Sequence, residues 1–344
     1  MELLANILLL AGLIAMVAVQ GAYFTHMLQL NSYRSERYQK WCRENLSRVF
    51  SPRRWVLPVI AACAGIFFGT WGQLAAGIIL LAASLLNVPP KAKKPLVITP
   101  RVKRLFVTQG LLLALVCVVE WFLYPHPVAA LLLTVWVSLV FLWVWLSTLI
   151  NQPMEKAISN HYVEDARKRL ATMPDLTVIG ITGSYGKTST KTFLHSLLSV
   201  KYNVLMTPES YNTTMGVVRT IREQLKPMHK IFIAEMGAKN PGDIREICDL
   251  VHPRYGILTS IGEQHLETFK SIDNIIRTKF ELVDALPSDG IAFLNMDNAY
   301  IRSRSVENVP CVTYGVQTDS GAQYTASNIT VGGSGSTFTI TAPD

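Results

Sequence analysis

Charged residues and cysteines are both scarce in this sequence. Only 16% of its 344 residues are charged, whereas soluble globular domains usually have about 25%, which argues against a wholly soluble protein. The cysteines are odd in number and widely spaced, and none belongs to a CxxC or Cys/His cluster. This spacing argues against a disulfide framework and against a zinc site. The five cysteines are Cys42, Cys63, Cys117, Cys248 and Cys311.

Acidic residues are scarcest in the first part of the chain. Residues 1–150 contain 13 Lys and Arg but only four Asp and Glu, whereas the remainder contains 19 and 20. The net charge of +8 therefore comes from the first part. A nucleic-acid-binding face would not segregate its charge in this way, and we expect no nucleic-acid partner. Short basic loops between membrane spans produce this pattern.

Long uncharged runs occupy the same part of the chain. Residues 3–23 are long enough to cross a bilayer, which needs about 20 residues, and they lack the basic start of a signal peptide. The basic segment 31–54 is predicted to form a helix at the membrane surface. Residues 55–88 are apolar again. Because the segments on both sides of them are basic, we predict a hairpin of two spans that returns the chain to the side it left.

Two further apolar runs, 105–124 and 128–150, flank a short turn at 124–127 that has no basic residue. The prediction is a five-span anchor over residues 1–150, with the N-terminus outside and everything after Asn151 in the cytoplasm. Glu120 is the one acidic residue within a span, and it lies close to the outer turn. With so little charge inside the membrane, we expect the spans to anchor the protein and not to transport a solute.

The remainder of the chain has the pattern of an α/β domain. Residues 151–174 have helical spacing and mixed charge, which predicts a connecting helix. Residues 175–344 alternate apolar strands with helices, which indicates a mostly parallel sheet with helices on both faces. From Tyr324, two alternating runs around the turn 332–335 predict an antiparallel hairpin. No helix follows this hairpin, so we expect the domain to be incomplete at its C-terminal end. Strands are predicted at 177–182, 203–207, 230–235, 255–261, 290–295 and 311–315, and helices at 187–200, 215–225, 241–251 and 272–286.

The clearest chemical signal is GITGSYGKTS at 180–189, between a predicted strand and a predicted helix. This context is that of a phosphate-binding loop, although Ile181 stands at the first glycine position of the common GxxxxGK[ST] pattern. Glycines let backbone N–H groups turn inward, and the helix N-terminus adds its positive end. Lys187 would then reach the β- and γ-phosphates, and the Thr188 hydroxyl would bind Mg²⁺. The loop residues are Gly183, Ser184, Tyr185, Gly186, Lys187, Thr188 and Ser189.

Three more polar residues are predicted near the carboxyl edge of the sheet, where such folds bind ligands. Glu235 ends a predicted strand and is placed to bind the same Mg²⁺, while His265 follows the next strand. Taken singly, Glu235 could instead be an ordinary solvated acid, and His265 could be a structural histidine. Lys279 lies on the apolar side of a predicted helix, where an unpaired ammonium is costly. It therefore either reaches solvent or is chemically modified.

Five segments in this order resemble the Mur ligase family, the ATP-dependent enzymes that build the peptidoglycan stem peptide. The segments are TGSYGKTSTK (182–191), TPESYNTTMGV (207–217), AEMGA (234–238), QHLE (264–267) and LNMDN (294–298). They look most similar to the branch that adds D-alanyl-D-alanine. The resemblance covers residues 175–315 and implies a P-loop middle domain that uses ATP and Mg²⁺.

The resemblance also implies roles for the matching residues. The implied catalytic residues are Lys187, Glu235, His265 and Lys279, the metal ligands are Thr188, Glu235 and His265, the nucleotide ligands are residues 183–189 and Asn295, and the substrate ligands are Asn212 and Thr213. Lys279 occupies the place of a lysine that several members carry as a carbamate. Thr213 stands where the family usually has the second of two asparagines.

The implied reaction is amide formation between a muramoyl-peptide-type carboxylate and the amine of an amino acid or dipeptide. The carboxylate attacks the γ-phosphate of ATP, and the amine then attacks the acyl phosphate to give the amide, ADP and phosphate. Soluble members have an N-terminal domain where this chain has five spans, and a C-terminal domain that closes over ATP. We therefore expect either a longer chain or a partner from the cell-wall synthesis machinery.

The leading hypothesis is a Mur-type acid–amino acid ligase, anchored in the bacterial plasma membrane with its ATP-binding domain in the cytoplasm and membrane lipid around its spans. Two alternatives remain open at this point. One is a poly-γ-glutamate synthase-like ligase, and the other is a non-catalytic ATP-binding scaffold of the cell-wall machinery.

Overall fold

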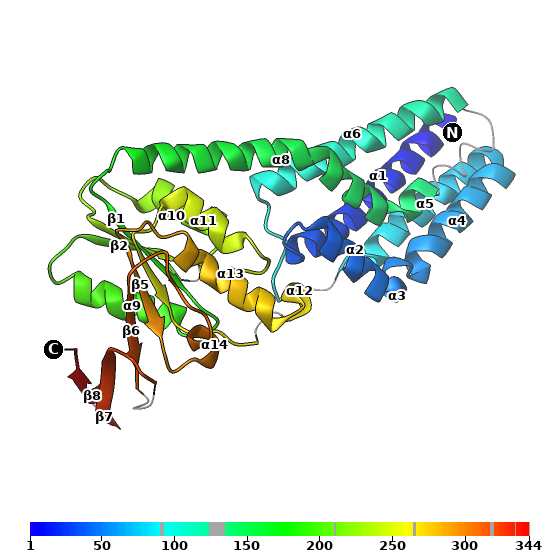
Figure 1. The fold of residues 1–344 in the computed structure, drawn as a ribbon. Coiled ribbons are helices and arrows are strands. Elements are labelled where there is room, and N and C mark those ends of the chain that lie inside the picture. Colours follow the sequence, from blue (N-terminus) through cyan, green and yellow to red (C-terminus); the bar gives the residue numbers. More distant parts are fainter. Residues whose placement is uncertain are drawn as a thin grey trace. The chain divides into compact units, whose positions relative to one another are not determined.

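The chain forms two units in a computed structural model. The structure describes residues 1–89, 93–123, 135–209, 211–263, 266–316, 320–333 and 335–343. A helical unit covers Met1–Ala157, and an α/β unit covers Ile158–Asp344. Each unit is built around its own buried apolar clusters, and each is described separately below (Figure 1).

Helices make up the helical unit, and most of them are apolar. They are α1 (Glu2–Leu30), α2 (Ser35–Glu44), α3 (Leu46–Val49), α4 (Pro52–Phe67), α5 (Gly69–Leu86), α6 (Pro100–Leu123) and the start of α8 (Val140–Ala171). Within the described residues, four segments are long and apolar enough to cross a membrane: Glu2–Leu30, Leu46–Phe67, Gly69–Leu86 and Pro100–Val119. The predicted turn at 124–127 and the start of the predicted span 128–150 lie outside the described residues, as does the side chain of Glu120.

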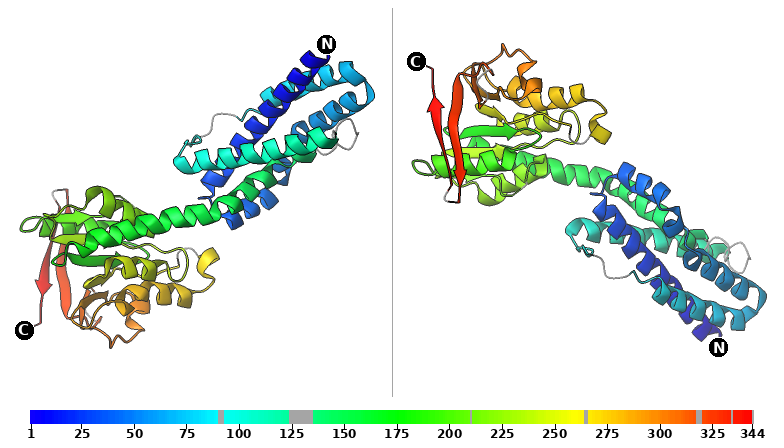
Figure 2. Two further views of the ribbon diagram at one scale, coloured as in Figure 1. Left: turned by 90° about the horizontal axis from the view of Figure 1, so that it is seen from above. Right: turned by 90° about the horizontal axis from the view of Figure 1, so that it is seen from below.

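The predicted helical hairpin is confirmed, since α4 and α5 pack against each other after a break at Phe68. Helix α1 lies beside α5, as Figures 1 and 2 show. Glycines allow this close approach: a Cβ atom on Gly12 would lie only 2.8 Å from the carbonyl oxygen of Gly77. Small residues at such crossings are typical of helices that pack in membranes.

The basic segment 31–54 does not form the single helix that its charge pattern predicts. Ser32 and Tyr33 have positive φ angles of 59° and 56°, which turn the chain at the end of α1. Two short helices, α2 and α3, follow, separated at Asn45. Pro52 then starts α4, where its fixed φ and missing N–H are tolerated. Arg53 and Arg54 therefore belong to the first turn of an apolar helix.

A separate connecting helix at 151–174 is not observed, because α8 is continuous from Val140 to Ala171. Pro153 lies inside this helix and removes one backbone hydrogen bond without ending it. The boundary between the two units falls at Ala157, within α8. The chain therefore passes from the apolar segment to the α/β unit without a loop.

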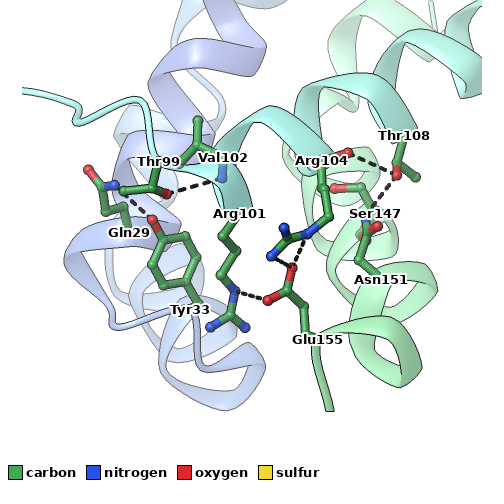
Figure 3. A network of polar contacts seen from close by, with 10 residues as sticks. All are labelled: Gln29, Tyr33, Thr99, Arg101, Val102, Arg104, Thr108, Ser147, Asn151 and Glu155. Carbon is green, nitrogen blue, oxygen red and sulfur yellow. Dashed lines mark hydrogen bonds and ion pairs between the residues drawn. The ribbon is translucent and has the colours of Figure 1, made fainter. Parts of the chain in front are cut away.

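A polar network joins α1, α6 and α8 within the helical unit (Figure 3). The Arg104 guanidinium donates to Glu155 Oε1 from Nε at 2.7 Å, and Arg101 Nε lies 3.5 Å from Glu155 Oε2. Gln29 bonds to both the carbonyl and the amide of Val97, at 2.9 and 3.0 Å. These contacts place the basic segment before α6 against the carboxyl end of α1.

The α/β unit is an eight-stranded sheet in the order β2-β3-β1-β4-β5-β6-β7-β8. All neighbouring strands are parallel except β7 and β8, which form the predicted antiparallel hairpin. The strands are β1 (Thr177–Thr182), β2 (Val204–Met206), β3 (Ile231–Glu235), β4 (Tyr255–Leu258), β5 (Ile291–Asn295), β6 (Cys311–Gly315), β7 (Tyr324–Gly332) and β8 (Gly335–Thr341). Ser334 and Asp344 lie outside the described residues.

Helices cover both faces of this sheet, as predicted (Figure 1). On one face, α9 (Lys187–Leu198) packs on the isoleucines of β1 and β3 through Leu194 and Leu198. The other face carries the larger core, built with α10 (Thr214–Gln224), α11 (Asp243–Val251) and α13 (Ile272–Asp284). Two short helices, α12 (Leu266–Phe269) and α14 (Ala299–Arg302), complete the unit.

Candidate active site

The candidate site lies at the carboxyl ends of β1, β3 and β4, which are neighbours in the sheet. The loop after β1 contains the phosphate-loop motif, β3 ends at Glu235, and the segment after β4 begins at Thr259. In open parallel sheets, ligands bind at this edge, where the loops of adjacent strands come together.

The phosphate loop requires its glycines. Gly183 has φ +151°, and a Cβ atom there would lie 2.1 Å from Thr259 Oγ1. Gly186 has φ +82° and is the N-cap of α9, a left-handed conformation that favours glycine. These two positions let the loop turn sharply from the buried strand into the helix.

Residues after β4 form hydrogen bonds with the phosphate loop. Thr259 Oγ1 donates to the Tyr185 carbonyl at 2.6 Å, and the Tyr185 amide donates to Ser260 Oγ at 2.9 Å. The Ser184 hydroxyl donates to the Gly262 carbonyl at 3.1 Å and accepts from its amide at 3.0 Å. The side chain of Ser184 therefore fixes the shape of the loop.

Lys187 folds back over the loop that precedes it. Its ammonium donates to the carbonyls of Gly183 at 2.6 Å and Ser184 at 3.2 Å. Burial lowers the pKa of Lys187, and the negative charge of Glu235 opposes that shift. A cation held between the loop and a carboxylate is suited to neutralising nucleotide phosphates.

Glu235 connects two other predicted site residues, Thr188 and Asn212. Its side chain is 1% exposed. Oε2 accepts from the Thr188 hydroxyl at 3.1 Å, and Oε1 accepts from Asn212 Nδ2 at 3.1 Å. The nucleotide loop and the predicted substrate segment thus share one carboxylate, which the sequence pattern alone did not predict.

Lys191 is a residue of this site to which the sequence analysis gave no role. It is 1% exposed, and its ammonium lies 2.9 Å from Glu235 Oε2. It also donates to the Glu209 carbonyl at 2.5 Å, in the predicted substrate segment. Its place one helical turn after Lys187 is the signal that could have identified it.

Lys279 is buried on α13, as predicted, with 5% of its side chain exposed. Burial, followed by the positive charge of Lys187, lowers its pKa to about 8, while Glu281 and Asp243 oppose the shift. Lys279 is therefore still mainly protonated at neutral pH, but its neutral form, which is the form that reacts with electrophiles, is far more populated than in a free lysine.

The remaining predicted ligands make contacts within the chain. Asn295 Nδ2 donates to the Thr259 carbonyl at 2.8 Å, and its Oδ1 accepts from the Asp297 amide at 3.0 Å. The Thr213 hydroxyl caps α10 by accepting from the Gly216 amide at 3.3 Å. These contacts give both residues a structural role, and their ligand contacts stay predictions. His265 lies outside the described residues.

The residues at the loop suit a magnesium ion that is bound together with a nucleotide. Thr188 Oγ1 and Glu235 Oε2 supply two hard oxygen atoms 3.1 Å apart. Mg²⁺ in such sites takes one or two protein oxygens and completes its shell with phosphates and water. No group of three or more His, Cys, Asp or Glu residues gathers in the part of the chain that the structure describes.

The fold and the loop define this unit as a P-loop α/β domain. Residues 181–344 match the family profile described as the Mur ligase middle domain. Over these residues, which make up just under half of the chain, the sequence is similar to the Mur ligase family. The curated relatives reported below carry the name of the D-alanyl-D-alanine-adding branch.

Two relatives illustrate the extent of the match. UDP-N-acetylmuramoyl-tripeptide–D-alanyl-D-alanine ligase of Mycobacterium leprae is 37% identical over 123 residues, which cover 36% of this chain and 24% of the relative. The protein of that name in Escherichia coli is 29% identical over 203 residues, which cover 57% of this chain and 45% of the relative. The chain thus spans about a quarter to a half of these relatives.

Solved structures of similar proteins also match about half of the chain. MurF ligase from Thermotoga maritima in complex with ADP has a TM-score of 0.49 and 29% identity, and the match covers 53% of this chain and 42% of that one. A MurF structure from Acinetobacter baumannii has a TM-score of 0.49 and 27% identity, with 53% and 40% covered.

Proposed function

We propose that this chain is the membrane-anchored, ATP-binding part of a Mur-type ligase that forms an amide bond in peptidoglycan precursor synthesis. The observation that carries the proposal is the convergence of Lys187, Thr188 and Glu235 on one phosphate loop. A scaffold without catalytic activity has no need of a buried carboxylate at the position where the nucleotide's metal would bind. This arrangement favours an enzyme.

The substrates proposed are those in the relatives' names, a muramoyl tripeptide and D-alanyl-D-alanine. The backbone amides of the loop and Lys187 would bind the ATP phosphates, and Thr188 and Glu235 would hold Mg²⁺, which supplies positive charge to the γ-phosphate when bound. Asn212 lies beside Glu235, so the muramoyl carboxylate would approach the γ-phosphate from that side. Carboxylate attack releases ADP, and attack by the amine on the acyl phosphate releases phosphate and forms the amide.

The anchoring part of the proposal rests on the helical unit. The basic segments 31–54 and 93–104 lie at the same end of α1. His26 hydrogen-bonds to the Lys94 carbonyl at 2.8 Å, and the Arg101 guanidinium carbon lies 4.4 Å from the ring centroid of Tyr33. Basic segments at one end of a group of apolar helices favour a multi-pass protein with that end in the cytoplasm. Membrane lipid would surround the helices, and the N-terminus would lie outside.

The test is ATP-dependent ligation by membranes that contain the full chain. With UDP-N-acetylmuramoyl-tripeptide and D-alanyl-D-alanine as substrates, Lys187→Ala should abolish both product formation and ATP turnover. Lys201→Ala removes an equal charge just beyond α9 and should leave both unchanged. Turnover that persists in Lys187→Ala would contradict the assignment of the phosphate loop.

A further inference from the structure

Arg54 is a buried cation in the first turn of α4, at the basic end of the helical unit. Its side chain is only 8% exposed, whereas that of the adjacent Arg53 is exposed. Buried guanidinium groups in proteins normally pair with an anion, because removal of an unpaired charge from water is costly.

The contacts of Arg54 inside the chain are uncharged. Its guanidinium carbon lies 4.2 Å from the ring centroid of Tyr23 and 5.0 Å from that of Phe24. Nη1 donates to the Arg48 carbonyl at 2.6 Å. Nε is buried and has no hydrogen-bond partner among the described residues. The aromatic rings orient the guanidinium but leave its charge and one donor unmatched.

The described carboxylates of this unit do not pair with Arg54. Glu155 is held by Arg101 and Arg104 (Figure 3), and Glu44 pairs with Lys40. Glu2 lies in the first turn of α1, 21 residues before Tyr23, which is about 30 Å along a helix. With 13 basic residues against four acidic ones up to residue 150, the unit has more cations than its own acids can neutralise.

We infer that Arg54 is the centre of an anion-binding site for a phosphate group, supplied by an anionic phospholipid headgroup. A phosphodiester would supply the negative charge that the guanidinium lacks, and the planar fork of the guanidinium suits its oxygens. This inference rests on the membrane anchoring in the proposed function. In that orientation, the first turn of α4 lies at the level of the cytoplasmic headgroups.

The experiment compares Arg54→Gln with Arg53→Gln, which removes the same charge one residue away from an exposed position. The full chain is extracted from vesicles of phosphatidylglycerol and phosphatidylcholine, and native mass spectrometry counts the lipids retained. Wild type and Arg53→Gln should each retain one phosphatidylglycerol per chain. Arg54→Gln should bind it about tenfold more weakly or lose it, the effect of one charged hydrogen bond.

Several results would overturn the inference. They are retention of phosphatidylglycerol by Arg54→Gln, equal loss in both variants, and a wild type with no preference for phosphatidylglycerol over phosphatidylcholine. The comparison of the two lipids uses the wild type alone, so it can contradict the inference even if Arg54→Gln fails to fold. The lipid-free wild type also distinguishes lipid from free phosphate. If inorganic phosphate raises its thermal stability as much as phosphatidylglycerol does, the bound phosphate group need not come from a lipid, and that part of the inference is wrong. Carbonate extraction tests anchoring separately, because release of the wild type would refute the anchor and not the phosphate site.

Discussion

The two units differ in how they neutralise buried charge. In the α/β unit, the buried Lys191 ammonium lies 2.9 Å from the buried Glu235 carboxylate. In the helical unit, the buried Arg54 contacts aromatic rings and a backbone carbonyl, and it has no carboxylate partner among the described residues. The difference follows composition, since residues 151–344 have 19 basic and 20 acidic residues, whereas residues 1–150 have 13 and four. Lys191 therefore has its counter-ion within its own unit, whereas Arg54 has none among the described residues of the helical unit.

The largest effect is expected from Glu235→Ala, which would give the α/β unit an unpaired buried cation as well. This change leaves Lys191 buried without its carboxylate and removes the proposed Mg²⁺ ligand. We expect complete loss of ATP turnover and a loss of about 3–5 kcal/mol in the free energy of unfolding. Limited proteolysis of the full chain against temperature measures the second effect.

A matched control is Asp249→Ala, which breaks the exposed Arg245–Asp249 pair. Exposed pairs contribute about 0–1 kcal/mol, so turnover and stability should be nearly unchanged. Equal destabilisation by the two changes would contradict the claim that the Lys191–Glu235 pair differs from a surface ion pair.

The second prediction concerns the coupling within the buried pair. Lys191→Met leaves Glu235 uncompensated and removes the donor to the Glu209 carbonyl, whereas the double change Lys191→Met/Glu235→Gln leaves no buried charge. We expect the double variant to be more stable than the sum of the single effects predicts, by about 1–3 kcal/mol. Additive effects in the same proteolysis assay would show that the two side chains act independently.

The third prediction is a pH dependence caused by Lys279. Its pKa is lowered from 10.5 to about 8 in the folded chain, so the unfolded chain binds the proton more tightly. The free energy of unfolding is therefore lowest below pH 8, where Lys279 is protonated in the folded chain. It rises as the pH increases from about 8 to about 10.5. Lys279→Met should therefore remove this rise and add up to about 3 kcal/mol of stability below pH 8. Identical pH profiles for the variant and wild type would contradict the burial of a titrating ammonium.

The sequence predicted the sheet well because its strands are short apolar runs separated by clear helical patterns. Predicted strands 177–182 and 311–315 coincide with β1 and β6, and the hairpin of α4 and α5 followed from loop charge. The division of segment 31–54 was missed because it depends on the backbone angles of Ser32, Tyr33 and Asn45, which composition does not encode. The continuity of α8 was missed because Pro153 and a change in composition both imitate a boundary.

In the candidate site too, residues within local motifs were predicted, whereas contacts between distant segments were not. Lys187, Thr188 and Glu235 were identified because a motif and a strand end determine their positions. Sequence spacing could not show that Lys191 lies between Glu235 and the Glu209 carbonyl, since that contact joins three segments far apart in the chain. Nor could it show that the Asn295 and Ser184 side chains bond to the segment after β4, because their partners, Thr259 and Gly262, are far from them in the sequence.

The proposed function requires that this one chain both binds ATP and is anchored in a membrane. The most direct measurement is Mg²⁺-dependent binding of labelled ATP to membranes that contain the full chain and have been washed with alkaline carbonate. We predict saturable binding that stays with the membranes and is lost in Lys187→Ala. Release of the protein by the carbonate wash, or ATP binding that Lys187→Ala leaves unchanged, would contradict the account.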